Sequence, residues 1–274
     1  MAKAADNELG EEKQRARRQW GNDPAGAVYG REHEFGSREF FEEVERHRYH
    51  VYAPWMPEVM GFDKHAGEKL LEVGCGMGTD LLQFARGGAI CTGVDLTPRS
   101  IEISRHRFRL YDVPATFLIA DGEKLPFPDN TFEIVYSNGV LHHTPDTVAA
   151  VQEVHRVLRP GGIAKVMLYY RHSLNYWGEI MLHRGLLRGQ LLRGDTPEQI
   201  MGRFVEYGDD TEPLVKVYSR AQARRLFHSF RDVDFEINQM TRSEFYALGP
   251  LIPERLFRAL RQRFGWSLIA TATK

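Results

Sequence analysis

The sequence has only two cysteines and no long hydrophobic run among its 274 residues. No apolar stretch approaches the roughly 18 residues of a membrane-spanning helix, and the first 20 residues lack the apolar centre of a secretory signal. The two cysteines, Cys75 and Cys91, cannot frame a disulfide-rich fold, so we expect reduced thiols. These absences predict a cytoplasmic protein without stable membrane insertion.

The chain also lacks an excess of either charge and any familiar metal-binding motif. Lys plus Arg number 36 and Asp plus Glu number 37, so the net charge of −1 provides no general attraction for nucleic acid. The 11 histidines occur without an H-E-x-x-H or Cys-x-x-Cys pattern, which predicts no metal site. A hydrophobic content of 42% with 27% charged residues is typical of a folded globular protein.

The segment from Lys69 to Asp95 predicts a strand, a glycine turn, a helix and a second strand. Its apolar start suits a buried parallel strand. Gly74, Gly76 and Gly78 permit positive φ and place no Cβ against a ligand. Asp95 ends the second strand 19 residues after Gly76, close to the spacing of about 20 for a carboxylate that binds a ribose hydroxyl. This pattern indicates a nucleotide-binding crevice.

The glycine spacing argues against a dinucleotide. It reads Gly-x-Gly-x-Gly, whereas the pyrophosphate fingerprint is G-x-G-x-x-G, and the Lys-Ser/Thr pair of a P-loop is missing. Glu72, just before the loop, would repel a pyrophosphate but attract a cation. S-adenosylmethionine has no phosphate and carries a sulfonium and an ammonium, so carboxylates at Glu72 and Asp95 fit it chemically.

With these features the sequence resembles the class I S-adenosylmethionine-dependent methyltransferases, in particular the small-molecule group that includes the quinone-biosynthesis C-methyltransferases. The resemblance covers about residues 65–170 and rests on LLEVGCGMGTD, GVDLTPRSI, IADGEKLPFPDNTFEIVYSNGVLHH and EVHRVLRPGGIAKVMLYY, in the family's order. It implies a doubly wound, mostly parallel seven-stranded α/β sheet of the Rossmann-like type. It also implies S-adenosylmethionine as cofactor and S-adenosylhomocysteine as product.

The resemblance places cofactor contacts in the glycine loop and after the second, third and fourth strands. Asp121 follows the third strand, at the crevice where open α/β sheets bind ligands, and the family has a carboxylate there on the adenine amino group. The backbone after the fourth strand contacts the methionine part of the cofactor. The predicted cofactor-binding residues are Glu72, Gly74, Cys75, Gly76, Thr79, Asp95, Leu96, Ala120, Asp121, Gly122, Glu123, Asn138 and Gly139.

Acceptor chemistry is expected just beyond the fourth strand. His142 and His143 are candidates for a general base, since an imidazole of pKa near 6.5 can take a proton at neutral pH. Alternatively, neither is a base and both shape the pocket. Tyr29 and Tyr169 are candidate substrate contacts. The acceptor is expected to be a small molecule, and methylation of oxygen, nitrogen, sulfur or carbon stays open.

Four parts of the chain are predicted. They are an N-terminal helical segment (1–62), a cofactor-binding core (63–170), a helical insertion (171–217) and the end of the core (218–274). Within the first part, residues 1–19 are typical of a solvated helix, and 20–41 either pack on the sheet domain or form a mobile lid. The insertion is interpreted as an acceptor lid or homodimer contact, with a membrane-surface helix as the alternative. A non-catalytic sensor of the cofactor or its product is the alternative function.

Capping residues and apolar runs predict the element boundaries. Helices are expected to begin at Ser37, at Thr97-Pro98, at Thr144-Pro145, at Thr196-Pro197 and at Ser219. Strands are expected at Ala115–Ala120, Ile163–Tyr170, Val233–Asn238 and Ser267–Thr273.

Overall fold

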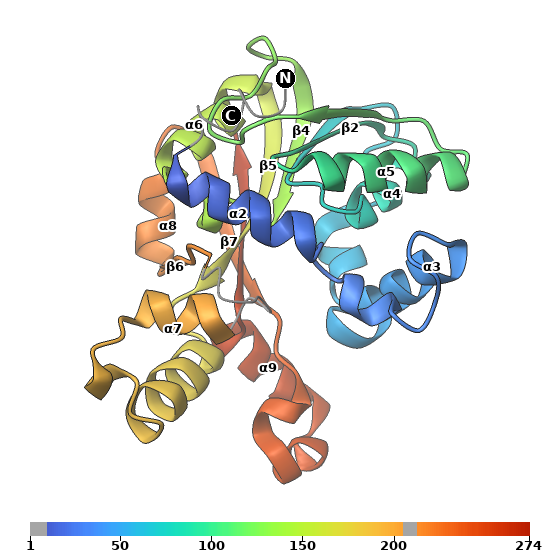
Figure 1. The fold of residues 1–274 in the computed structure, drawn as a ribbon. Helices are drawn as coiled ribbons and strands as arrows, with labels where there is room; N and C mark the ends of the chain where they lie inside the picture. The colour runs from blue at the N-terminus through green and yellow to red at the C-terminus, as the bar shows by residue number, and fades with distance from the viewer. Residues whose placement is uncertain (1–9, 205–212) are drawn as a thin grey trace.

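The computed structural model describes residues 10–204 and 213–274, and Figure 1 shows their arrangement around a central sheet. Seven strands follow the order β3-β2-β1-β4-β5-β8-β7, and the short β6 pairs with β5. All pairs are parallel except those that β8 makes with β5 and β7. The strands are β1 (Lys69–Val73), β2 (Ile90–Asp95), β3 (Thr116–Ile119), β4 (Phe132–Asn138), β5 (Leu158–Tyr170), β6 (Val217–Tyr218), β7 (Asp232–Asn238) and β8 (Ser267–Thr273). The predicted fold class is confirmed.

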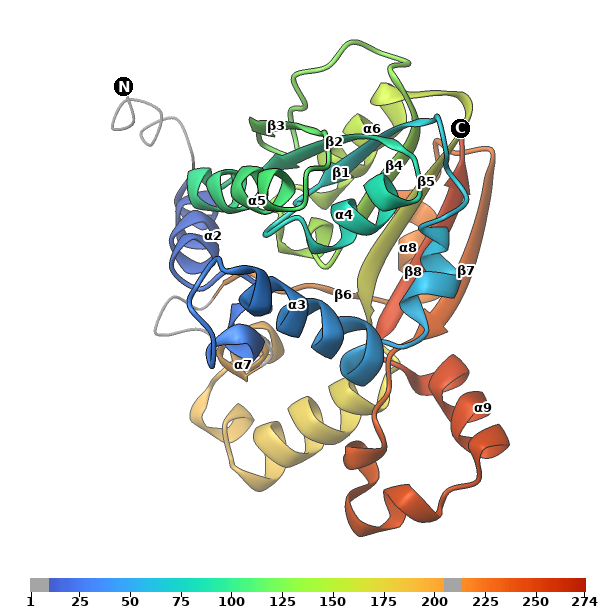
Figure 2. The same ribbon diagram turned by 90° about the vertical axis from the view of Figure 1, so that its right-hand side faces the viewer.

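Helices cover both faces of the sheet, as Figure 2 shows. The α-helices are α2 (Glu11–Asn22), α3 (Arg38–Arg46), α4 (Thr79–Arg86), α5 (Pro98–Leu110), α6 (Thr147–Val157), α7 (Pro197–Phe204), α8 (Arg220–Leu226) and α9 (Glu254–Phe264). The 3₁₀ and π-helical segments are η1 (Ala27–Gly30), η2 (His47–Tyr52), η3 (Pro57–Gly61), η4 (Leu141–His143), η5 (Asn175–Leu187), η6 (Leu191–Arg193) and η7 (Arg242–Leu251).

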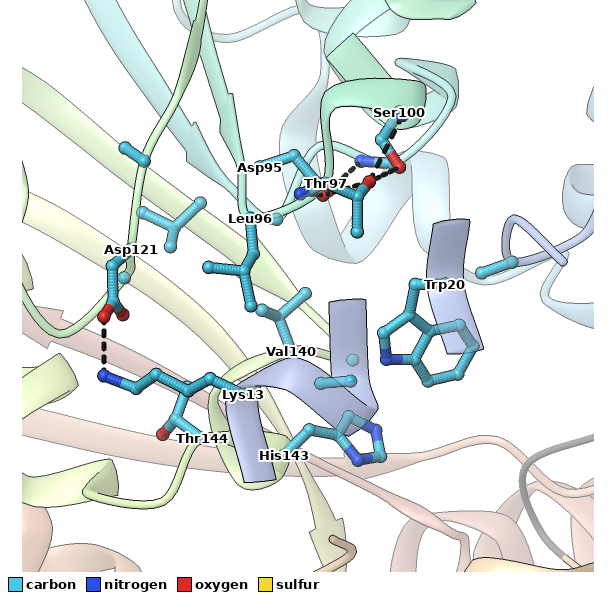
Figure 3. Close-up of a pocket in the computed structure, with 18 of the residues that line it drawn as sticks. Lys13, Trp20, Asp95, Leu96, Thr97, Ser100, Asp121, Val140, His143 and Thr144 are labelled. Carbon is cyan, nitrogen blue, oxygen red and sulfur yellow. Dashed lines mark hydrogen bonds and ion pairs between the residues drawn. The ribbon is translucent and has the colours of Figure 1, made fainter. Parts of the chain in front are cut away.

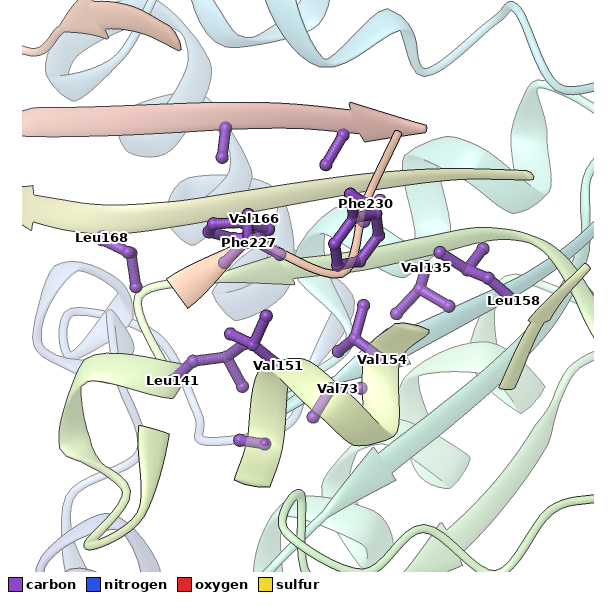
Figure 4. Close-up of a cluster of buried hydrophobic side chains, with 14 of the residues drawn as sticks. Val73, Val135, Leu141, Val151, Val154, Leu158, Val166, Leu168, Phe227 and Phe230 are labelled. Carbon is purple, nitrogen blue, oxygen red and sulfur yellow. The ribbon is translucent and has the colours of Figure 1, made fainter. Parts of the chain in front are cut away.

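Two hydrophobic cores hold the three layers together. On one face, α6 and the α8 region pack on β4, β5 and β8, with Val151, Val154 and Phe227 buried among strand residues (Figure 4). On the other face, α4, α5 and the N-terminal segment pack on the same sheet through side chains such as Phe84 and Phe108. Because both faces are covered, the strands at the centre are apolar in succession, as in Leu70 and Leu71 of β1. This explains why the sequence predicts a buried parallel sheet.

Most predicted helix starts are confirmed by their caps. The hydroxyls of Ser37 and Thr97 accept hydrogen bonds from the amides of Phe40 and Ser100, at 3.1 Å and 3.2 Å. Ser219 caps α8 in a reciprocal arrangement with Gln222. Such caps satisfy amides that lack intrahelical partners.

Two predicted boundaries are wrong by a few residues. The helix α6 begins after Asp146, whose carboxylate accepts from the Ala149 amide at 2.9 Å, and not at Thr144-Pro145. Strand β5 begins at Leu158 and not at Ile163, since Leu158 pairs with Phe132 across a register shift in β4. Gly161 and Gly162 lie in the irregular start of this strand.

Two excursions leave the end of the sheet. Residues 171–217 form η5, η6 and α7, which have a small core of their own with Ile180, Ile200 and Met201 against Trp266. Between β7 and β8 the chain makes a second helical excursion, η7 and α9, which was not predicted separately from the end of the core. None of the helices in 10–204 and 213–274 has the length and apolar content needed to span a membrane.

Candidate active site

A cavity of about 160 Å³ lies at the carboxyl ends of the parallel strands (Figure 3). The glycine loop, the ends of β2 and β4 and the segment after β3 form one wall, and helix α2 crosses the opposite side. Nine of the predicted cofactor-binding residues line it. These are Gly74, Gly76, Asp95, Leu96, Ala120, Asp121, Gly122, Asn138 and Gly139.

The glycine loop is attached to the end of β2. The amides of Gly74 and Cys75 both donate to the Val94 carbonyl, at 2.8 Å and 3.0 Å. Gly76 has φ of +52° and a Cβ placed there would meet no protein atom within 4 Å, whereas a Cβ at Gly74 would lie 2.3 Å from Val140. Gly76 therefore presents bare backbone to the cavity, and Gly74 is required for close packing within the protein.

Asp95 organises this loop as well as the cavity wall. One carboxylate oxygen accepts from the Gly76 amide at 2.9 Å, and the other accepts from the amide and hydroxyl of Thr97 at 2.8 Å and 2.9 Å. Burial raises the pKa of Asp95, although these donors oppose the shift. A carboxylate oxygen has more than one lone pair, so the same group can also accept from a ligand hydroxyl.

Asp121 is paired with a residue that the sequence did not single out. Lys13 of α2 places its Nζ 2.5 Å from Asp121 (Figure 3). The same Nζ lies 2.5 Å from Glu123. Although burial opposes its charge, these carboxylates raise the pKa of Lys13. The expectation of a merely solvated helix over residues 1–19 is therefore wrong for its described part, since Lys13 and Ala16 line the cavity.

Four predicted cofactor residues lie outside the cavity wall. Glu72 is buried with one oxygen lacking any hydrogen-bond partner among residues 10–204 and 213–274, and burial followed by the charge of Asp80 raises its pKa well above the ordinary value. Cys75 is buried beside Ser104, where burial raises the pKa of the thiol. Thr79 accepts from Arg107, and Glu123 contacts Lys13. Their cofactor roles stay predictions.

A buried cluster around Asp80 fixes the N-terminal segment to α4. Arg48 donates twice to the Asp80 carboxylate at 2.6 Å, and the hydroxyls of Tyr49 and Tyr136 donate at 2.6 Å and 2.8 Å. Burial opposes ionisation of Asp80, but these donors hold its pKa below the ordinary value. The cluster neutralises Arg48, which lines a second cavity.

The two neighbouring histidines of η4 point to different surroundings. His142 is fully buried, with its ring centroid 4.2 Å from that of His143 and 3.9 Å from that of Tyr169, and it lines neither cavity. His143 lines the first cavity and meets Trp20 edge-on at 5.7 Å between centroids. Its Nδ1 lies 2.7 Å from the Leu214 carbonyl, which can only accept, so Nδ1 carries the hydrogen and Nε2 of the neutral ring holds the lone pair.

We expect His142 to make the protein sensitive to mild acid. Burial, and then the neighbouring His143, lower the pKa of His142 well below its ordinary value, so the unfolded chain takes up this proton at a higher pH than the folded one. The free energy of unfolding should therefore fall as the pH drops below about 6.5, by up to about 1.4 kcal/mol per pH unit from this group. Chemical denaturation of His142→Leu should show a shallower slope there. His172→Leu, which removes an exposed imidazole, is the control, and equal slopes for wild type and His142→Leu would contradict the assignment.

The second cavity, of about 430 Å³, adjoins the first. Both are lined by Trp20, Ala25, Asn138 and Gly139. Its wall is rich in aromatic rings, to which the N-terminal segment, β5, the excursion 171–217 and the start of β8 contribute. These rings are Trp20, Tyr29, Tyr52, Tyr169, Phe204 and Trp266. The structure thus brings both predicted substrate contacts, Tyr29 and Tyr169, to one cavity.

The first cavity has the chemistry that S-adenosylmethionine requires. Gly76 leaves room that a side chain would fill, and two carboxylates, Asp95 and Asp121, follow β2 and β3 where a ribose and an adenine can meet them. Within the described parts of the chain, no group of three His, Cys, Asp or Glu residues could hold a metal ion.

Comparison with known proteins agrees with this geometry. Residues 71–166 match a family model described as a methyltransferase domain. Over this part, the chain is similar to methyltransferases, in agreement with the resemblance of its motifs to the class I family. This part contains the glycine loop, both cavity carboxylates and both histidines of η4.

The curated relatives match only part of this chain, and the similarity over most of its length is a similarity of fold alone. The chain is 36% identical over 100 residues to 27-O-demethylrifamycin SV methyltransferase of Amycolatopsis mediterranei, covering 35% of this chain and 37% of that protein. It is 35% identical over 115 residues to malonyl-[acyl-carrier protein] O-methyltransferase of Serratia marcescens, covering 42% and 44%. The chain thus spans less than half the length of these relatives. A solved methyltransferase from Methanosarcina mazei matches 80% of this chain and 97% of its own, with a TM-score of 0.57 and 20% identity.

Several residues of the first cavity were not predicted from the sequence as cofactor contacts. Thr97 was predicted only as a helix start, and Ser100 appeared only within the motif GVDLTPRSI, yet both line the cavity beside Asp95. Their place directly after an acid that ends a strand was a usable signal. Lys13 had none, because its partner Asp121 lies 108 residues away in the chain.

Proposed function

We propose that this protein is an S-adenosylmethionine-dependent methyltransferase that methylates a small molecule. The observation that carries the proposal is the contact between the two cavities. The glycine-loop cavity, with Gly76 and Asp95, shares Trp20 and Asn138 of its wall with a separate aromatic cavity. A methyl donor in the first and an acceptor in the second would meet at their common boundary, as methyl transfer requires.

The residues of this chain would act mainly by binding and positioning. Asp95 and Asp121 would accept hydrogen bonds from the ribose and the adenine, and the backbone at Gly76 would lie against the ligand. S-adenosylmethionine, when bound, supplies an electrophilic methyl carbon on a sulfonium. Trp20 and the rest of α2 would exclude water from the boundary between the cavities, which strengthens electrostatic interactions there.

His143 is the better placed of the two candidate bases. Its ring is in the wall of the first cavity, and the Leu214 carbonyl sets the tautomer that leaves Nε2 basic. His142 lies behind it with no exposed surface. We therefore assign removal of the acceptor proton to His143 where the acceptor carries one, and a packing role to His142.

The acceptor is expected to be uncharged and largely aromatic or apolar. Six aromatic rings line the second cavity, with Tyr29 stacked on His47 at 3.5 Å between centroids. The charged groups on its wall already have partners, since Arg48 pairs with Asp80 and Glu179 pairs with Arg184. A charged acceptor would lose its hydration there without a free counterion in return.

Calorimetry followed by methyl transfer tests this function. The protein should bind S-adenosylmethionine and S-adenosylhomocysteine but not NAD, and should transfer labelled methyl to members of a panel of phenols, quinones and polyketides. Binding without transfer to a metabolite extract would favour the sensor alternative. Failure to bind either sulfur compound would refute the proposal. The predicted homodimer and cytoplasmic location stay predictions for light scattering and cell fractionation.

Asp95→Asn should weaken cofactor affinity by roughly 1.5–3 kcal/mol, because it removes the charge from a hydrogen bond to the ribose. The amide keeps the size of the carboxylate, but its NH2 group replaces one of the two oxygens that accept from Gly76 and Thr97, so the loop is disturbed as well. Calorimetry with S-adenosylhomocysteine measures the loss. An analogue without the 2′- and 3′-hydroxyls is the control, since its loss reports the disturbed loop alone and should be smaller than the loss for the complete ligand. Equal affinity of both proteins for the complete ligand would rule out this contact.

A further inference from the structure

The most exposed apolar side chains of the described structure gather on the two helical excursions. Among the side chains that the structure describes, which leave out those of 246 and 247, only four large apolar ones exceed 60% exposure, and all four are leucines of these excursions. Leu187 and Leu192 are 73% and 83% exposed on η5 and η6, and Leu248 and Leu251 are 67% and 75% exposed on η7. A folded domain has no packing reason to hold four such leucines in water.

The two excursions project from the same end of the molecule. In Figure 1 and in Figure 2, which differ by a quarter turn about the vertical, the yellow helices of η5 and the red helices of η7 and α9 both form the lower end. Each is anchored to the sheet domain by buried residues, among them Ile180 and Phe257. We call residues 182–193 and 248–264 together the Leu/Arg surface.

Arginines without acidic partners accompany these leucines. Residues 242–264 contain five arginines and two carboxylates, whereas residues 171–217 contain six basic and seven acidic residues, close to the balance of 36 and 37 in the whole chain. The described acidic side chains form no salt bridge with six of the nine arginines in 175–204 and 242–264, whereas Arg184, Arg203 and Arg242 are paired. Of the six, Arg261 is half-buried and the other five are exposed. The five are Arg188, Arg193, Arg255, Arg258 and Arg263.

Leucines and arginines alternate closely on this surface. The sequence Leu-Leu-Arg-Gly occurs at 186–189 and again at 191–194, and both glycines have positive φ, +74° at Gly189 and +94° at Gly194. Each repeat therefore ends in a turn that presents an exposed leucine beside an exposed arginine. Apolar side chains with arginines next to them are suited to the boundary between lipid headgroups and acyl chains.

We propose that the Leu/Arg surface docks this protein peripherally on an anionic phospholipid bilayer. The leucines would enter the headgroup region, and the five arginines would interact with lipid phosphates. A second copy of the chain fits less well, because a two-fold contact through this surface would bring unpaired arginines together. The inference goes beyond the proposed methyl transfer and does not depend on it. Since Glu179 and Ile180 of η5 also line the aromatic cavity, docking would bring that cavity close to the lipid.

Vesicle flotation with the full chain tests the inference. Wild type should float with vesicles of phosphatidylglycerol and phosphatidylcholine, more weakly with phosphatidylcholine alone, and less as salt is raised. Arg188→Gln with Arg193→Gln should lower partitioning about 25-fold, since each arginine near an anionic surface contributes about fivefold. Leu187→Glu with Leu192→Glu, and separately Leu248→Glu with Leu251→Glu, should lower it by at least about tenfold.

Matched variants elsewhere serve as controls. Val148→Glu places a charge at an exposed apolar residue of α6, and Arg220→Gln with Arg225→Gln removes two exposed arginines of α8. These should bind like wild type. Wild type that stays with the protein-only fraction in both lipids would overturn the inference. So would equal losses in surface and control variants, or leucine variants that turn a dimer into monomers without any change in vesicle binding.

Discussion

Gly76→Val is expected to abolish cofactor binding while most of the fold remains. The backbone here has φ of +52°, and the space in front of its missing Cβ contains no protein atom within 4 Å. A valine side chain would therefore project into the cavity where the ligand must lie. We expect a loss of at least about 4 kcal/mol of binding free energy, equal to about three powers of ten in the dissociation constant. Calorimetry with S-adenosylhomocysteine measures it.

Gly67→Val separates this steric effect from backbone strain. Gly67 has φ of +79° and also no atom within 4 Å of an added Cβ, but it precedes β1 and lies outside both cavities. Both variants should lose about 1–2 kcal/mol of unfolding free energy, because a residue with a Cβ is strained in the left-handed conformation. Only Gly76→Val should lose the ligand. If Gly76→Val binds as tightly as Gly67→Val, the cofactor does not lie against this loop.

His143→Gln should reduce turnover by roughly 10² to 10⁴, the usual contribution of a general base, if the acceptor carries a proton that must be removed. Glutamine can still donate to the Leu214 carbonyl, so the side chain keeps its anchor while losing the basic nitrogen. The measurement is the methyl-transfer rate against pH at saturating cofactor. The variant should stay slow across the whole pH range in which the wild type is active.

Cofactor affinity provides the control for His143→Gln, because loss of a base should leave binding near wild type. His143→Ala should lose at least as much turnover as His143→Gln. His142→Gln should lower mainly the stability of the protein. Wild-type turnover in both single variants and in the double variant would show that neither histidine removes a proton. A carbon or thiolate acceptor would be consistent with that outcome, and both side chains would then only shape the pocket.

The sequence by itself determined those features of this protein that depend on residues close to one another along the chain. The apolar run before Gly74, the three positive-φ glycines and the helix that follows predict the first βαβ unit, and the structure confirms it. The cap at Thr97 and the acid at the end of β2 are equally local. Parallel strands then bring their carboxyl ends to one edge, so Asp95 and Asp121 fall into one cavity without further information.

Only the tertiary structure decided which of the candidates face the cavity. His142 and His143 are adjacent in sequence, yet the 3₁₀ turn of η4 buries one and leaves the other in the cavity wall. Glu72 fits a cation by its position in the motif, but its side chain is buried away from the wall. The strand or turn determines the position of a residue's backbone, whereas tertiary packing determines which groups surround its side chain.

Contacts between distant segments were likewise decided by packing alone. Lys13 meets Asp121 across 108 residues, and the aromatic cavity is assembled from the N-terminal segment, β5, η5 and Trp266. Periodicity reports only which face of an element is buried, and says nothing of the element that covers it. The glycine loop was predictable because backbone conformation is a property of a few consecutive residues, whereas the wall opposite that loop depends on how whole helices dock on the sheet.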